Sequence, residues 1–135
     1  MIGTKPVALA KLLLFVAVVE IATGLALLAD PGLVIALLLG ASGSPEATAI
    51  GRFLGIALLA LGLACRPIMQ RASDTAPAIQ AMLLYNLLVA LYLACLGTIG
   101  HSGGLLLWPA VALHAVVALL LIWAWRTNQQ AGGAC

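Results

Sequence analysis

The sequence predicts an all-α integral membrane protein: a bundle of four transmembrane helices with a short interfacial or re-entrant helix after the first span. Three observations support this fold class. The chain of 135 residues is 64% hydrophobic and only 7% charged, whereas soluble domains are roughly 25% charged. Four apolar stretches are each long enough to cross a bilayer. The basic residues cluster in alternate connections between these stretches. The whole chain, residues 1–135, is therefore expected to form a single membrane domain.

The first span, residues 12–29, is apolar throughout except for one carboxylate, Glu20, near its midpoint. At a rise of ~1.5 Å per residue this stretch covers roughly 27 Å, which is close to the hydrocarbon thickness of a bilayer. Asp30 and Pro31 then break the pattern, as a helix N-cap followed by the first residue of a new helix. The apolar run that follows, residues 33–39, is too short to span and is expected to lie at the outer interface.

The second span, residues 47–65, carries a stripe of glycines at a helical period: Gly51, Gly55 and Gly62. Such a stripe allows another backbone to approach closely. We interpret it as ordinary close packing and not as a dimerisation motif.

The third and fourth spans are residues 78–97 and 105–125. The third contains Tyr85 and Asn86, and the fourth contains His114. Tryptophans stand near both ends of the fourth span: Trp108, Trp123 and Trp125. Their positions match the aromatic belts at membrane interfaces.

The charges predict the orientation through the positive-inside rule. If four spans are real, one side carries Lys5, Lys11, Arg66, Arg71 and Arg126, and the other carries Asp30, Glu46 and His101. Both termini are therefore expected on the cytoplasmic side of a bacterial inner membrane. The net charge of +2 is small, and its distribution indicates orientation in the membrane. We therefore exclude nucleic acid as a partner.

Three polar side chains are expected to form one layer inside the bundle. Counted from the outer ends of their spans, Glu20, Asn86 and His114 lie roughly 14 to 17 Å deep. Thr23, on the face of Glu20, and Tyr85, next to Asn86, complete the candidate network. Two interpretations stay open: a structural cluster of interhelical hydrogen bonds, or a site that exchanges protons or binds a ligand.

Other candidate sites are few. Arg52 lies within the second span against the charge bias, and we expect it to form an ion pair with Asp30 at the outer interface. The cysteines, Cys65, Cys95 and Cys135, have no metal-binding spacing, and no second carboxylate completes a metal site in the polar layer. No nucleophile with an adjacent base and no phosphate-binding loop is visible, so the sequence supplies no reason to expect an enzyme.

One family resemblance bears on function. The run from Gly55 to Pro67, GIALLALGLACRP, resembles the second-helix segment of the DoxX-like small bacterial membrane proteins. The layout of the stretch from Phe15 to Pro31 is similar to their first helix. The resemblance implies a four-helix inner-membrane bundle that serves as an accessory or partner subunit, in a group that includes subunits linked to quinone redox chemistry. No cofactor motif is present, and a quinone or a lipid is the ligand that the resemblance would imply.

A second resemblance gives the alternative function. The stretch Val19 to Gly24 is similar to the first helix of the small multidrug resistance transporters, where a carboxylate exchanges protons for cationic drugs. On this alternative, Glu20 would drive proton-coupled transport of a small molecule. The strong Lys/Arg bias and the insertion between Asp30 and Glu46 depart from that family.

Overall fold

The computed structural model describes residues 5–66, 75–100 and 103–132, and these residues form five helices. They are α1 (Lys5–Ala29), α2 (Pro31–Leu39), α3 (Pro45–Ala64), α4 (Thr75–Thr98) and α5 (Leu107–Gly132). Four of them are long and apolar enough to cross a membrane, whereas α2, at 9 residues, is not. The predicted all-α fold with four spans and one short helix is confirmed. Arg71 and His101, used in the predicted topology, lie outside the described residues.

The span boundaries differ from the predicted ones by a few residues at each end. The candidate spans are Leu9–Ala29, Pro45–Ala64, Ala76–Thr98 and Leu107–Thr127. The helices extend beyond the purely apolar stretches because polar residues at a helix end remain helical once the apolar part is ordered.

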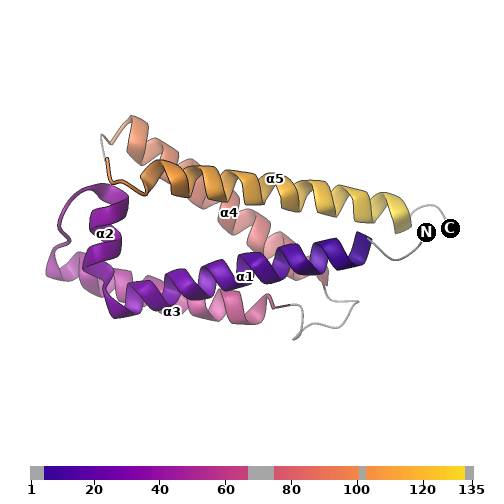
Figure 1. The fold of residues 1–135 in the computed structure, drawn as a ribbon, viewed down its shortest axis with the longest axis horizontal. Coiled ribbons are helices and arrows are strands. Elements are labelled where there is room, and N and C mark those ends of the chain that lie inside the picture. The colour runs from indigo at the N-terminus through magenta and orange to yellow at the C-terminus, as the bar shows by residue number, and fades with distance from the viewer. Residues whose placement is uncertain (1–4, 67–74, 101–102, 133–135) are drawn as a thin grey trace.

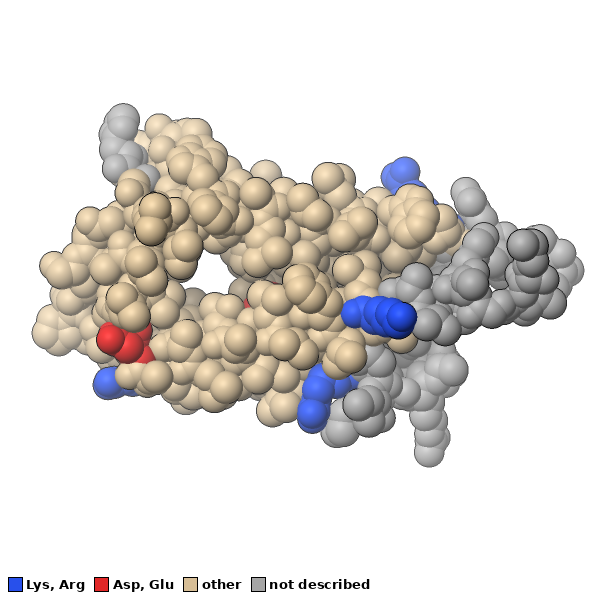
Figure 2. Space-filling view, viewed as in Figure 1, with Lys and Arg blue, Asp and Glu red and all other residues tan. Residues whose placement is uncertain are grey.

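The long helices form two antiparallel pairs, α1 with α3 and α4 with α5 (Figure 1). The two termini lie together at one end of the bundle, which we call the terminus end. The short helix α2 lies across the opposite end, which we call the α2 end (Figure 1). In the described part of the chain, Lys5, Lys11, Arg66 and Arg126 lie at the terminus end, as the alternating charges predict. Figure 2 shows most of the visible basic atoms toward this end.

Glycines make the α1–α3 pair close, as the stripe on α3 predicts. Gly51, Gly55 and Gly62 are all buried. A Cβ atom added to Gly55 would lie 2.8 Å from the carbonyl oxygen of Gly24, and one added to Gly62 would lie 2.8 Å from that of Ala17. The stripe therefore packs against α1 of the same chain, where only a hydrogen fits between the backbones.

The short helix α2 is defined by residues that start and stop helices. Asp30 caps its N-terminus, accepting a hydrogen bond from the backbone N–H of Leu33 at 2.9 Å, and Pro31 is its first residue, as predicted. Gly40 ends it in the left-handed conformation, at φ 74°, which glycine adopts without steric cost.

The C-terminal end of α2 holds the connection between α4 and α5. The backbone N–H of Leu106 donates to Leu37 O at 2.8 Å, and that of Gly103 donates to Leu39 O at 3.3 Å. Gly104 packs directly on the backbone of Leu37 and Leu38, where a Cβ atom has no room. Because α2 follows α1 in the chain, these contacts join the two helix pairs at the α2 end.

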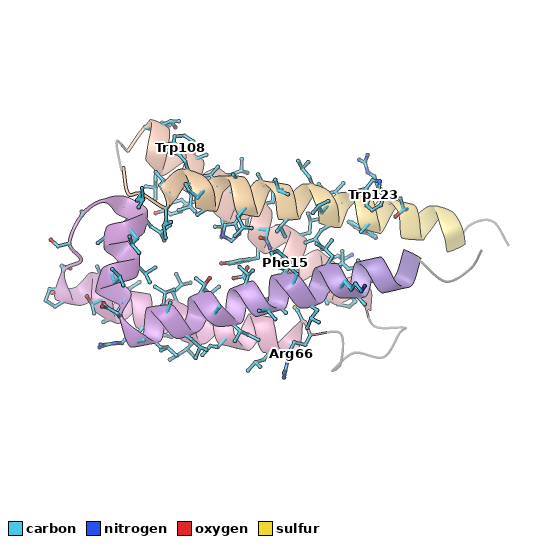
Figure 3. The ribbon with its side chains drawn as sticks, in the orientation of Figure 1. Phe15, Arg66, Trp108 and Trp123 are labelled. Carbon is cyan, nitrogen blue, oxygen red and sulfur yellow. The ribbon has the colours of Figure 1, made fainter. Side chains whose placement is uncertain are left out.

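At the terminus end the pairs are joined by an apolar core. Its buried members come from α1, α4, α5 and the residue after α3: Leu9, Leu13, Val16, Ala17, Cys65, Ala78, Ile79, Met82, Val117, Leu121 and Ala124. Of the tryptophans, Trp125 is partly buried against this core. Trp108 and Trp123 are exposed on α5 toward opposite ends of the bundle (Figure 3), which fits the predicted aromatic belts at the two membrane interfaces.

Candidate functional site

Glu20 lies in the middle of α1 and faces the interior of the protein. Only 1% of its surface is exposed, although every neighbouring residue of its span is uncharged. Its Oε1 atom is buried and has no hydrogen-bond partner within the described part of the chain. More than nine in ten buried polar groups in proteins have such a partner. Among the described residues, Glu20 Oε1 is therefore an exception, a buried polar atom without a hydrogen-bond partner.

Tyr85 of α4 connects Glu20 to the opposite helix pair. Its phenol lies close to the Glu20 carboxylate and interacts with it electrostatically. The same ring packs edge-on against the imidazole of His114, with ring centroids 5.9 Å apart and planes at 79°. Tyr85 thus lies between the acid on α1 and the imidazole on α5.

Asn86 fixes the position of His114. Its Nδ2 donates to the Met82 carbonyl one turn earlier in α4, at 2.8 Å, and its Oδ1 lies 2.8 Å from His114 Nδ1. An amide oxygen can only accept, so His114 Nδ1 must carry a hydrogen. In the neutral ring the other nitrogen, Nε2, is then an acceptor with a free lone pair.

Glu20, Asn86 and His114 lie near one another, as predicted. Asn86 contacts His114 directly, and Tyr85 lies between His114 and Glu20. We call these four residues the polar cluster. Thr23, predicted to join it, donates instead to the Val19 carbonyl of its own helix at 2.9 Å. From the sequence, Tyr85 was placed in the network without a specific role, and the hydrogen bond from Asn86 to the Met82 carbonyl was not predicted. Met82 and Asn86 are four residues apart, a spacing at which polar side chains often bond to a carbonyl of their own helix, and this spacing could have indicated that bond.

The ion pair between Arg52 and Asp30 at the outer interface stays a prediction. Both side chains are exposed, and no salt bridge joins them in the described residues. Asp30 uses its Oδ1 to cap α2, and this local bond competes with any reach toward Arg52. Residues of the described ranges also provide no group of three His, Cys, Asp or Glu side chains that could hold a metal ion.

The surroundings of the polar cluster differ on its two sides. On every helix the core residues that join the pairs lie toward the terminus end: Leu13 and Val16 before Glu20, Met82 before Asn86, and Val117 and Leu121 after His114. Toward the α2 end the two helix pairs separate. Figure 2 shows an opening there that passes through the molecule between α1, α5 and α2. The cluster therefore lies at the boundary between a sealed core and an open space.

Comparisons with protein-family models, with curated proteins and with solved structures find no significant match to this chain. The polar cluster and the fold therefore carry the functional argument by themselves.

Proposed function

We propose that this chain is a multi-pass membrane protein that couples proton exchange on Glu20 to the binding or transport of a small molecule. The observation that carries the proposal is the buried, unpartnered Oε1 of Glu20. A purely structural cluster gains stability when each polar atom is paired, because an unsatisfied buried acceptor costs about 1 to 3 kcal/mol. An oxygen kept open in the bundle interior is better explained by an intermittent partner, either a proton or a donor group of a ligand.

The rest of the cluster supports the same role. Tyr85 contacts Glu20 from the other helix pair, so a change in the charge of the carboxyl alters a bond between the two pairs. Proton exchange can therefore favour one arrangement of the pairs over another, which is the physical requirement for coupling protonation to transport.

Glu20→Gln tests this proposal, because an amide keeps the shape and hydrogen-bonding capacity of the acid but cannot titrate. Infrared spectra of the purified protein in lipid should show a protonated-carboxyl C=O band that changes with pH in the wild type. Glu20→Gln should lose that band and keep the helical fold. The control is Glu46→Gln, which removes an exposed acid and should retain it. Identical pH-dependent spectra for wild type and Glu20→Gln would overturn the proposal.

A second candidate function is an accessory subunit of a bacterial inner-membrane assembly, related to electron transfer as the DoxX-like resemblance implies. Arg52 favours it. This cation is exposed on α3, roughly 10 Å beyond the start of the helix at Pro45, and no described residue pairs with it. A cation at that depth needs a partner or must extend toward the interface, and an acidic residue of another subunit would provide one.

Purification in mild detergent from the native membrane distinguishes the two functions. Co-purification with larger subunits, lost in Arg52→Gln but retained in Arg52→Lys, would support the accessory role. A homogeneous preparation of this chain alone, unchanged by either substitution, would contradict it.

A further inference from the structure

The opening between the helix pairs faces the lipid phase. It runs across the long helices, between α1 and α5, with α2 on one side (Figures 1 and 2). When the four spans stand upright in a bilayer, an opening in this direction has both mouths in the hydrocarbon region. A molecule would therefore enter it sideways from the bilayer and not from water.

Both ends of the opening are closed along the membrane normal. Toward the terminus end lies the apolar core, with the fully buried side chains Leu13, Met82 and Leu121. Toward the α2 end, the bonds from Leu106 and Gly103 to the carbonyls of α2 hold the connection between α4 and α5 in place. Apart from acidic atoms in a recess beside it, the visible rim of the opening carries no charged groups (Figure 2). The space thus suits an apolar body.

The hydrogen-bonding groups of the polar cluster indicate which head group a bound amphipathic molecule would carry. Glu20 Oε1 has no donor in the described residues. His114 Nε2 is an acceptor in the neutral ring because Asn86 holds the hydrogen on Nδ1. Asn86 Nδ2 already donates to Met82 O, and the Glu20 carboxylate beside Tyr85 can accept more than one hydrogen bond. The site therefore offers a ligand hydrogen-bond acceptors, Glu20 Oε1 and His114 Nε2.

We infer that the opening is a binding site for an amphipathic molecule that enters from the bilayer with an apolar body and a hydrogen-bond-donating head group, ammonium or hydroxyl. Its apolar body lies between α1, α5 and α2, and its head group reaches Glu20, which is only 1% exposed, by displacing the side chains that cover the carboxylate. The inference rests on the proposed function of Glu20 as an open acceptor and adds the class of molecule and its route.

Three probes with the same alkyl chain test the head-group chemistry: an alkylamine, an alkanol, and a fatty acid at a pH where it is ionised. Binding to the full chain in nanodiscs is compared with protein-free nanodiscs. The amine and the alkanol should bind, and the fatty acid, which offers only acceptors, should bind about tenfold or more weakly. Glu20→Gln should weaken amine binding by about tenfold or more, while Glu46→Gln should leave it unchanged. Equal binding of the three probes overturns the inference.

A pair of variants tests the location. Ala110 lies one turn from His114 on the same face of α5 and is half-buried, whereas Ala112 is exposed on the same helix. Ala110→Phe should fill the opening and weaken binding of the amine, and Ala112→Phe should not. Equal effects of the two variants would exclude the opening as the site.

The two proposals fail separately. If the pH-dependent carboxyl band of Glu20 is present but no probe binds, proton exchange stands and the ligand class is wrong. If the amine binds in a Glu20-dependent way while no carboxyl band changes with pH, the site is real but does not exchange protons.

Discussion

At the residue scale, Asn86 has a structural role that is distinct from that of Glu20. All of its polar atoms are used: Nδ2 bonds Met82 O, and Oδ1 accepts from His114. Its exposed surface is 1%. An asparagine satisfied in this way is a rigid support that sets the orientation of His114, whereas Glu20 keeps one oxygen without a partner among the described residues.

Asn86→Ala should therefore destabilise the protein. The change removes two hydrogen bonds and leaves His114 Nδ1–H without its acceptor, at an expected cost of about 1 to 2 kcal/mol. Thermal unfolding in detergent, followed by circular dichroism, should show a lower Tm. Gln80→Ala, an exposed polar residue of the same helix, is the control and should leave Tm nearly unchanged. Equal Tm values for wild type and Asn86→Ala would show that the hydrogen bond to His114 contributes nothing to stability.

At the element scale, the two pairs are held by different means. Small residues hold α1 against α3, because Gly24 and Gly55 bring the two backbones into direct contact. Without a hydrophobic driving force between helices in lipid, such close packing is a main source of association. The pairs themselves meet through the apolar core at one end and through α2 at the other, so they can move relative to each other more easily than the helices within a pair.

Gly55→Ala should separate α1 from α3. The added methyl group would lie 2.8 Å from Gly24 O and 3.1 Å from Leu27 Cβ. We expect an overpacking cost of about 1 to 3 kcal/mol, larger than the gain in helix propensity of up to ~1 kcal/mol. The free energy of unfolding, measured by denaturant titration in mixed micelles, should fall. Gly103→Ala places its methyl group in open space and should be tolerated. A more stable Gly55→Ala protein would contradict the close approach.

At the scale of the whole molecule, the sequence predicted those features that are set within a single helix, namely the depth of a residue and the caps at a helix end. The constant rise per residue of an α-helix predicted similar depths for Asn86 and His114, and their side chains are hydrogen-bonded. The caps of α2 followed from Asp30 and Pro31. The opening could not be predicted, because it depends on which helices pair and how far the pairs separate. The cap of α2 occupies one carboxylate oxygen of Asp30, and its ion pair with Arg52 stays a prediction.

The arrangement of the ends leads to a prediction about orientation. The start of α1, the end of α3, the start of α4 and the end of α5 lie at the terminus end, while the connection from α2 to α3 lies at the α2 end (Figure 1). The basic residues Lys11, Arg66 and Arg126 belong to the terminus end. The positive-inside rule then assigns that end to the cytoplasm.

Cysteine labelling in intact cells tests this orientation on a chain whose native cysteines are replaced. A membrane-impermeant thiol reagent should modify a cysteine at Ser44, which caps α3 at the α2 end and is exposed. A cysteine at Ser73, between α3 and α4 in the chain, should react only after the membrane is permeabilised. Reaction at Ser73 but not at Ser44 would reverse the orientation, and the acid–base chemistry of Glu20 would then face a lipid opening nearer the inner leaflet. Reaction at both would contradict four spans, because the single crossing by α3 must place these two connections on opposite sides of the bilayer.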